Sequence, residues 1–490
     1  MNDQPALGTP CYARLTAQQC EQLHQASLTI LERTGVRLFE PAAIDLLKKA
    51  GAAVDGDRVH IPARLVDQAL QTAPKSVTLF NRLGQPALNL EGYNVFFGPG
   101  SDTLHLIDHR TNERRKPVLQ DVRDGITVCD ALANIDFVMS LYLPSDVDQR
   151  LADRYQMEAM LNHTTKPIVI VTYEMSGLID AIEMSEAAVG GAQALREQPF
   201  VACYINVTTA LLHNQDALQK LLYLAEKNLP ALWIPVTSGG TSGPVTMAGN
   251  VALNNAGVLV GIVLSQLKRE GTPVIVPGFA GDALDLKTMV DPYAEPDHRG
   301  MAAALAHYYG LPMFSLAGGS DAKLVDPQAA IDAALTLAVE AISGGQLIHD
   351  LGYLESGLAF SLTQLAICDE IVAWLKPFLK PVEINDETLA LDLIDQLGPD
   401  GSFLNSAHTR QHYRERWYPT LIERFNYSQW EKKGGKTLAQ RAADRVESIL
   451  TSHCPVPLSE DAAQAVRAIV ERTAMAMKDA DSRAQARSLH

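Results

Sequence analysis

The pattern of apolar and polar residues changes twice along the chain. In the first part, apolar residues recur every three or four positions in segments that end at a glycine or a proline, which is typical of amphipathic helices. These segments are residues 19–35, 42–51 and 61–74. We therefore expect residues 1–92 to form an N-terminal helical cap.

From residue 93 onward, short apolar runs alternate with helical patterns. The eight runs are residues 94–100, 135–144, 166–174, 200–209, 231–240, 272–281, 311–319 and 346–354. The helical patterns are residues 119–133, 153–164, 178–191, 215–228, 248–271, 297–310, 326–345 and 362–379. The runs are nearly continuous, which indicates strands buried on both faces, as in a parallel sheet. Strands that alternate with helices form right-handed βαβ units, and eight such units suit a closed barrel.

An open, doubly wound sheet is the alternative arrangement. It would be favoured by a G-x-G-x-x-G turn after the first strand. The turn that is present reads GPGSDT, and it lacks the third glycine. We therefore predict an α/β fold in which residues 93–380 form a (β/α)8 TIM barrel. Residues 381–490 return to helical patterns, and we expect a C-terminal helical extension packed on the barrel.

The balance of charge narrows the class of ligand. The 490 residues include 41 lysines and arginines against 57 aspartates and glutamates, which gives a net charge of −16. Proteins that bind nucleic acid need a basic face, so we expect no nucleic-acid partner. An acidic surface is compatible with a cationic ligand or a protein partner.

The cysteines and the apolar runs bear on the compartment. The six cysteines form no C-x-x-C pair, so we interpret them as reduced thiols of a cytoplasmic protein. The first residues contain no apolar core typical of a signal peptide. No uninterrupted apolar stretch approaches the roughly 18 residues of a membrane span, so we expect no membrane contact.

A barrel of this kind places its functional site at the C-terminal ends of the strands. Aromatic rings gather there, and such rings attract cations, quaternary ammonium groups in particular. For any single ring, packing in the core or at the rim is the simpler interpretation. The aromatic residues are Phe97, Tyr142, Tyr173, Trp233, Phe279, Phe314 and Tyr353. The polar residues at strand ends are Ser101, Asp102, Glu174, Asn206, Thr208, Thr237, Ser238, Ser320, Asp321, Lys323, His349, Asp350 and Glu355.

Other chemistries have weaker support. His349 follows an apolar run and fits either a ligand-binding group or a core histidine. Lys323 lies in a D-x-K-x-x-D cluster with Asp321 and Asp326, where a Schiff-base lysine would indicate a lyase and a salt-bridged turn is the simpler interpretation. The sequence has no H-x-H, H-E-x-x-H, G-x-S-x-G or P-loop motif, so we expect no metal site.

Five long segments together resemble the trimethylamine methyltransferase family. They occur in order over nearly the whole chain, and two of them read SLAGGSDAKLVDPQAAIDAALT and IHDLGYLESGLAFSLTQLAICDEI. The segments are residues 28–66, 98–102, 309–336, 348–371 and 398–421. The resemblance implies a (β/α)8 barrel that moves a methyl group from an amine to the cobalt of a separate corrinoid protein.

The archaeal trimethylamine enzymes of this family carry pyrrolysine, and this chain contains only the twenty standard residues. The region in which to look for the missing residue is Gly318, Gly319 and Ser320. The departure favours the subgroup without pyrrolysine, which includes glycine betaine:corrinoid methyltransferases and relatives that act on proline betaine and carnitine. The expected substrate is therefore a quaternary amine, with glycine betaine or a related betaine foremost.

A quaternary nitrogen departs as a neutral amine, so the enzyme has to position and desolvate the methyl group. We accordingly assign no catalytic residue. We expect an aromatic wall of Phe97 with Tyr142 or Phe279. His349 is expected to bind the substrate carboxylate, with Tyr353 and Ser238 as further donors.

The resemblance also bears on cofactors and partners. We expect no tightly bound cofactor, because the D-x-H-x-x-G motif of corrinoid proteins is absent and a partner protein would supply the corrinoid (cobalamin). We also expect a homo-oligomer. Two alternatives are a methyl acceptor such as a folate, and a non-catalytic barrel that binds quaternary amines.

Overall fold

The barrel is the centre of the computed structural model, which describes residues 9–488. Seven of the eight expected runs are strands of one parallel sheet in the order β6-β15-β14-β13-β12-β10-β9. Their bounds are β6 Phe96–Pro99, β9 Ile168–Val171, β10 Val201–Val207, β12 Ala231–Pro235, β13 Val274–Pro277, β14 Met313–Leu316 and β15 Leu347–Leu351.

The remaining run fills the gap between β6 and β9 without forming a regular strand. On one side, the backbone N–H of Asp136 donates to the Phe97 carbonyl at 2.6 Å. On the other side, the N–H of Val138 donates to the Pro167 carbonyl at 2.9 Å. Leu141 then adopts a left-handed conformation with φ 65°, which breaks the extended pairing. The ring is therefore closed by hydrogen bonds on both sides of this segment, and the predicted fold class is confirmed.

Helices surround the ring at the positions that the sequence predicts. Their bounds are α4 Leu119–Ala131, α5 Ala152–His163, α6 Met175–Val189, α8 Gln215–Lys227, α9 Met247–Lys268, α10 Met301–Tyr309, α11 Pro327–Ile342 and α12 Leu362–Phe378. A short α7 (Ala192–Glu197) and β11 (Leu212–His213) lie in the connections. Close packing explains one glycine: a Cβ at Gly261 of α9 would lie 2.2 Å from the buried Trp233 ring of β12. Helix and strand can approach here only because that side chain is absent.

Helix α9 is long and apolar enough to cross a membrane by length and composition alone. Its most apolar window is 78% buried inside the protein, between the barrel and neighbouring helices. That burial is typical of a core helix in a globular protein.

The region before β6 contains the three expected helices, α1 (Ala17–Thr29), α2 (Pro41–Lys49) and α3 (Ala63–Thr72). It is not purely helical, so that part of the prediction is wrong. Strands β1 (Val36–Leu38), β2 (Ala53–Asp55) and β3 (Arg58–His60) form a small sheet with β11. Each strand has only three residues, too few for a periodic pattern to show.

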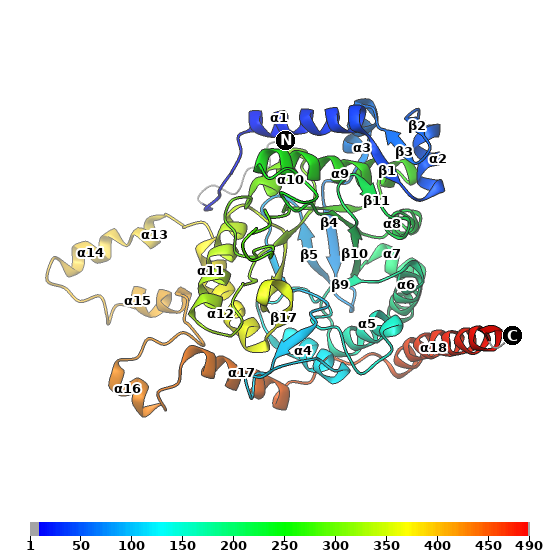
Figure 1. The fold of residues 1–490 in the computed structure, drawn as a ribbon. Helices are drawn as coiled ribbons and strands as arrows, with labels where there is room; N and C mark the ends of the chain where they lie inside the picture. The colour runs from blue at the N-terminus through cyan, green and yellow to red at the C-terminus, as the bar shows by residue number, and fades with distance from the viewer. Residues whose placement is uncertain (1–8, 489–490) are drawn as a thin grey trace.

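A second departure in this region is the hairpin of β4 (Val77–Phe80) and β5 (Pro86–Leu90). Its side chains pack in one apolar cluster with residues from inside the barrel, such as Val169, Ile275 and Leu347. The N–H of Phe80 donates to the Pro199 carbonyl just before β10, at 2.9 Å. The hairpin therefore fills the N-terminal end of the barrel (Figure 1).

The opposite end carries a small sheet of β7 (His105–Ile107), β8 (Arg114–Arg115), β16 (Tyr353–Leu354) and β17 (Ala359–Phe360). Beyond the barrel, α17 (Leu438–Ser452) packs on α12, and α18 (Glu460–Ser488) packs on α6. Three short helices instead project from the barrel, namely α13 (Asp386–Leu389), α14 (Leu391–Leu397) and α15 (Ala407–His412) (Figure 1). They are followed by α16 (Tyr427–Lys432).

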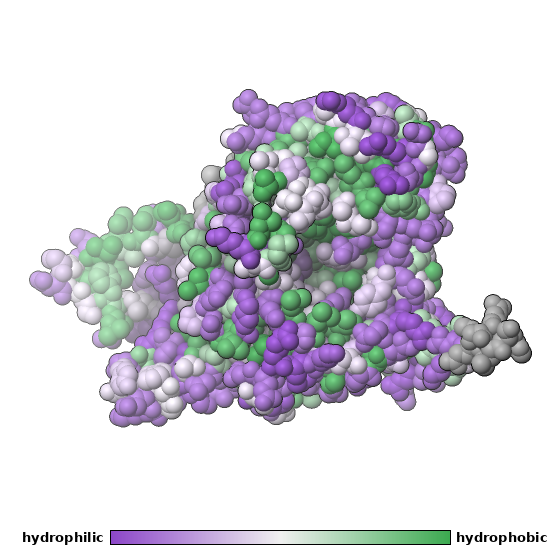
Figure 2. Space-filling model, in the orientation of Figure 1, coloured by the Kyte–Doolittle hydropathy of each residue, from purple (hydrophilic) through white to green (hydrophobic). Residues whose placement is uncertain are grey.

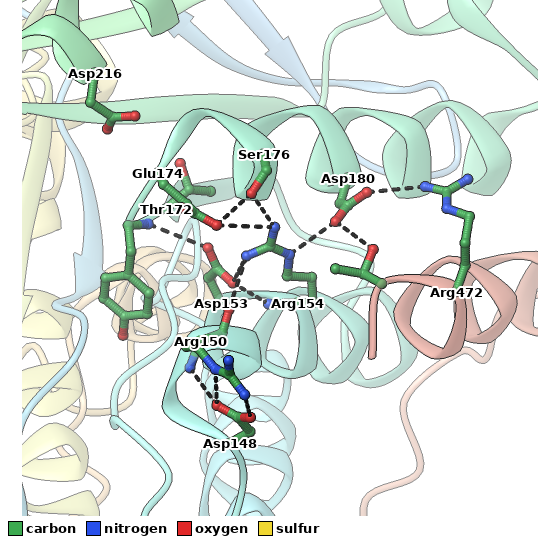
Figure 3. Close-up of polar contacts among 12 residues, drawn as sticks. Asp148, Arg150, Asp153, Arg154, Thr172, Glu174, Ser176, Asp180, Asp216 and Arg472 are labelled. Carbon is green, nitrogen blue, oxygen red and sulfur yellow. Dashed lines mark hydrogen bonds and ion pairs between the residues drawn. The ribbon is translucent and has the colours of Figure 1, made fainter. Parts of the chain in front are cut away.

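A buried ion network attaches α18 to the barrel (Figure 3). The Arg154 guanidinium, whose side chain is 0% exposed, lies 2.9 Å from Asp153 and 3.0 Å from Asp180. Arg472 of α18 reaches the other oxygen of Asp180 at 3.0 Å, and the Thr473 hydroxyl donates to the same carboxylate at 2.9 Å. Each carboxylate of this network therefore faces a cation.

Candidate active site

A cavity of about 390 Å³ lies at the C-terminal end of the barrel strands. Tyr204 and Asn206 reach it from β10, Phe279 follows β13, and His349 and Asp350 end β15. The face of the molecule in Figure 2 is hollowed over the centre of the strand ring. The cavity thus lies where a barrel of this class holds its ligand.

Four of the six predicted binding residues line this cavity. These are Ser238, Phe279, His349 and Tyr353. Phe97 and Tyr142 do not line it, and their expected place in the wall is a correction. Both rings are buried in the outer core, between the strands and the surrounding helices.

His349 is held as a neutral hydrogen-bond acceptor toward the cavity. Its Nδ1 lies 2.7 Å from the Ser315 carbonyl, and only a protonated Nδ1 can donate there. Burial lowers the pKa of His349 to about 3, so Nε2 carries no proton at neutral pH. Nε2 faces Asp350 Oδ1 at 3.4 Å. The geometry therefore opposes the expected role of His349 as a donor to a substrate carboxylate.

Asp350 is the most unusual residue of the cavity. It is 2% exposed and has a φ of 80°, a left-handed conformation that is rare for a residue with a side chain. Burial raises the pKa of its carboxyl far above the usual range, which the charge of Arg299 opposes. A protonated Asp350 can donate to the Nε2 of His349. A positive-φ residue with a perturbed pKa in a cavity is a candidate functional residue.

Asp102 contributes a second carboxyl to the same wall. Its Oδ1 accepts hydrogen bonds from Gln156 at 2.7 Å and from Ser140 at 2.9 Å. Desolvation raises the pKa of Asp102 to about 6, because these neutral donors offset only part of the cost of burial. Like Asp350, it is a carboxyl that a bound cation would favour in its ionised form.

Two more carboxylates come from the segment between β13 and α10, residues 282–300. Asp282 lies beside the imidazole ring of His298, and Asp291 accepts a 2.8 Å hydrogen bond from the Ser238 hydroxyl. The donor of Ser238 is therefore directed to Asp291. Among the described residues that line the cavity there is no lysine or arginine. The walls consequently attract a cation.

Aromatic rings complete these walls. The rings of Tyr204, Phe279, Tyr293 and Tyr353 line the cavity, and the Phe314 ring stacks on His349 with a centroid distance of 4.0 Å. The Tyr353 hydroxyl donates to the Ser101 carbonyl and accepts from the Ser101 N–H. Tyr353 is therefore a wall residue, and its hydroxyl is not available as the expected donor. Rings beside carboxylates are the arrangement that binds quaternary ammonium.

The residues singled out for the missing pyrrolysine lie beside the cavity. Gly318 has a φ of 87°, and a Cβ at Gly319 would lie 2.6 Å from the Tyr293 ring. The buried Ser320 donates to Asp332 at 2.7 Å. Tyr293 therefore occupies the space that a side chain at residue 319 would need.

Lys323 is outside the cavity. Its Nζ donates to the Asp321 carbonyl at 2.7 Å, and the side chain is exposed. The described residues contain no group of three or more His, Cys, Asp or Glu side chains placed to hold a metal ion. A lyase that depends on Lys323 has no support from this arrangement.

Five residues that line the cavity were not among the candidates from the sequence, namely Tyr204, Asp282, Asp291, Tyr293 and His298. Tyr204 lies two residues before Asn206 on the same strand face, so strand periodicity could have identified it. The other four lie in the long connection of residues 282–300, which has no helix or strand. A connection of that length in a compact domain is itself a functional signal.

Comparisons with known proteins identify the family of the chain. The family model described as Trimethylamine methyltransferase (MTTB) matches residues 2–478. A trimethylamine methyltransferase of Desulfitobacterium hafniense is 32% identical over 94% of this chain and 94% of its own. A glycine betaine methyltransferase of the same species is 28% identical over 92% of this chain and 95% of its own.

One solved structure shares the fold. A crystal structure of the hydroxylamine MtmB complex has a TM-score of 0.50 at 12% identity, and the match covers 91% of this chain and 90% of that chain. At that identity the likeness concerns the fold alone. The family model, in contrast, spans nearly the whole sequence. The chain therefore belongs to the trimethylamine methyltransferase family and is an enzyme of the methyltransferase type.

Proposed function

We propose that this enzyme transfers a methyl group from a quaternary amine to the Co(I) of a corrinoid carried by a separate protein in the cytoplasm. The observation that carries the proposal is the cavity, whose walls combine aromatic rings with the carboxyls of Asp102, Asp282, Asp291 and Asp350. A quaternary ammonium cannot donate an ordinary hydrogen bond, so rings and carboxylates are the groups that recognise it.

The chemistry follows from the charge of the substrate. A corrinoid held by the partner protein would accept the methyl group through the electron pair of its Co(I). The C–N bond would break at the same time and leave a neutral tertiary amine. The leaving amine needs no proton, so the enzyme needs no general acid at the nitrogen. The residues of the cavity hold the ammonium, exclude water and turn one methyl group toward the mouth. Tyr204, Phe279 and Asp350 are the groups best placed for this work.

Glycine betaine or a related betaine remains the first candidate substrate. Its carboxylate would have to meet neutral donors, because His349, Tyr353 and Ser238 direct their protons elsewhere. The Tyr204 hydroxyl and the Asn206 amide lie on the cavity wall and can serve. The second candidate is a quaternary cation without a carboxylate, such as choline, which the four acidic residues favour.

The test is methylation of free cob(I)alamin, followed by absorbance. Glycine betaine, proline betaine, carnitine, choline and trimethylamine are offered one at a time. Methylcobalamin formed with a quaternary amine and not with trimethylamine supports the proposal and identifies the substrate. Formation with trimethylamine alone contradicts it.

Two other functions predict different results in the same experiment. An enzyme that uses an acceptor such as a folate would demethylate the amine without methylating cobalt. A non-catalytic barrel would bind the amine in calorimetry and show no turnover with either acceptor.

A further inference from the structure

The arm, defined as residues 381–416 with α13, α14 and α15, carries an apolar surface that none of the described residues covers. None of its three helices contains a buried residue. Its large apolar side chains include Val382 at 78%, Ile384 at 75%, Leu391 at 63% and Leu404 at 75% exposure. Figure 2 shows hydrophobic side chains gathered along the projecting arm. A monomer rarely exposes so continuous an apolar surface.

The first half of the arm is also strongly acidic. Residues 381–400 contain six aspartates and glutamates and no lysine or arginine. On α14, Leu391 and Ile394 are three residues apart, and so are Asp392 and Asp395, so an apolar and an acidic stripe run side by side. Asp392 and Asp395 have no ion pair with a described residue. This segment therefore presents a surface that fits a basic and aromatic partner.

Such a surface exists at the root of the arm. The groove, defined by residues 418–425 with Trp430, Lys433, Lys436 and Arg441, has a volume of about 500 Å³. Lys433 lies over the Phe425 ring at 4.4 Å, and Arg424 lies over the Trp417 ring at 5.0 Å. Neither cation has an ion pair within the described part of the chain. The groove is thus basic, aromatic and open.

The arm of a molecule does not reach its own groove. α14 lies at the far end of the arm, whereas α16, beside the groove, lies apart from it (Figure 1). A second copy of the chain offers the same groove to the first arm and its own arm to the first groove. Two reciprocal contacts of this kind close into a two-fold dimer, with no surface left for further addition.

We propose that the acidic, apolar arm docks into the basic, aromatic groove of a second copy of this chain. Asp392 and Asp395 face Arg424 and Lys433 of the other copy, and the leucine and isoleucine side chains cover the aromatic rings. The contact is independent of the methyl-transfer reaction, because it lies outside the cavity and needs no substrate.

Sedimentation of the purified full chain over a dilution series tests the proposal. The wild-type chain is expected to sediment with the mass of a dimer, twice its 53.2 kDa. The variant Asp392→Lys/Asp395→Lys and the variant Arg424→Glu/Lys433→Glu are each expected to sediment as monomers at concentrations where the wild type stays assembled. Glu270→Lys, at an exposed site far from the arm in sequence, is the matched control and keeps the wild-type mass.

Mixing the two charge-reversed variants provides the decisive result. A lysine arm fits a glutamate groove, and the acidic arm of the other variant fits the unchanged basic groove, so the mixture is expected to recover the assembled mass. Recovery excludes misfolding as the reason for the monomers. A wild-type monomer at every dilution, charge-reversed variants that remain assembled, or a mixture that stays monomeric would each overturn the proposal.

Discussion

Two groups of buried carboxylates lie near the same end of the barrel, and they differ in what neutralises them. Asp153 and Asp180 lie within 3.0 Å of the Arg154 guanidinium (Figure 3). Asp102 and Asp350 line the cavity without such a cation, and burial raises the pKa of both. The first group is neutralised by residues of the chain itself, and under the proposed function the second is neutralised when a cationic ligand binds. The comparison separates charges that stabilise the fold from charges that recognise a substrate.

The largest expected effect is on the free energy of unfolding, when the carboxylates of Asp153 and Asp180 lose the Arg154 guanidinium. Arg154→Met leaves the buried Asp153 without a cation and leaves Asp180 with only the partly exposed Arg472, and such a loss costs about 3–5 kcal/mol of folding free energy. Denaturant unfolding measures it. Arg472→Gln removes a guanidinium whose side chain is 54% exposed and is expected to cost under about 1 kcal/mol. Equal losses of unfolding free energy in the two variants would contradict the conclusion that Arg154 is the main cation of this network.

The next effect is on the affinity for the ligand and concerns the cavity carboxyl of Asp350. Asp350→Asn keeps the shape of the side chain but cannot ionise, so it removes the negative charge that a bound cation would favour. The Kd for the quaternary amine is therefore expected to rise about 30-fold, a loss of about 2 kcal/mol of binding free energy. Calorimetry measures the Kd, and denaturant unfolding is expected to show a stable protein. An unchanged Kd would remove Asp350 from the binding site.

A smaller effect follows from acidity. The pKa of Asp102 is about 6 in the free protein, and a bound cation favours the ionised carboxylate. The affinity is therefore expected to fall as pH drops through 6, by about tenfold between pH 7 and pH 5. Asp102→Asn is expected to weaken this dependence. An affinity that rises toward pH 5 would contradict the expectation that the ligand binds the ionised form of Asp102.

The smallest effect separates two phenylalanines that the sequence treated alike. Phe279→Leu removes a ring from the cavity and is expected to weaken binding about fivefold, or about 1 kcal/mol. Phe97→Leu alters the outer core and is expected to lower stability while leaving the Kd unchanged. If Phe97→Leu weakened binding and Phe279→Leu did not, Phe97 and not Phe279 would be the ring that contacts the ligand.

The sequence predicts the barrel well because each strand and helix carries its own periodic pattern. It fails for the segment of Asp136–Leu141, where an apolar run closes the ring without strand geometry, because hydrogen bonds to both neighbours substitute for a regular ladder. It also fails for the three-residue strands β1, β2 and β3, which are too short to show a period.

The candidate site could be predicted only in part. Strand-end position identifies Phe279 and His349, but it does not tell on which side of a strand a ring lies, so Phe97 and Tyr142 were included wrongly. Strand-end position also does not show which acceptor a side-chain N–H or O–H donates to. The hydrogen bonds of His349 and Tyr353 to backbone carbonyls are set by tertiary packing. Because these bonds use the protons of both side chains, neither residue can donate to a ligand, although both still line the cavity.

The β4–β5 hairpin has a kinetic consequence. Its side chains pack among residues inside the barrel, so the end opposite the cavity is filled. Under the proposed function, the amine and the corrinoid protein would both have to approach from the C-terminal end of the strands. Binding would then be ordered, with the amine first, and an excess of the corrinoid protein would inhibit turnover by occupying the free enzyme.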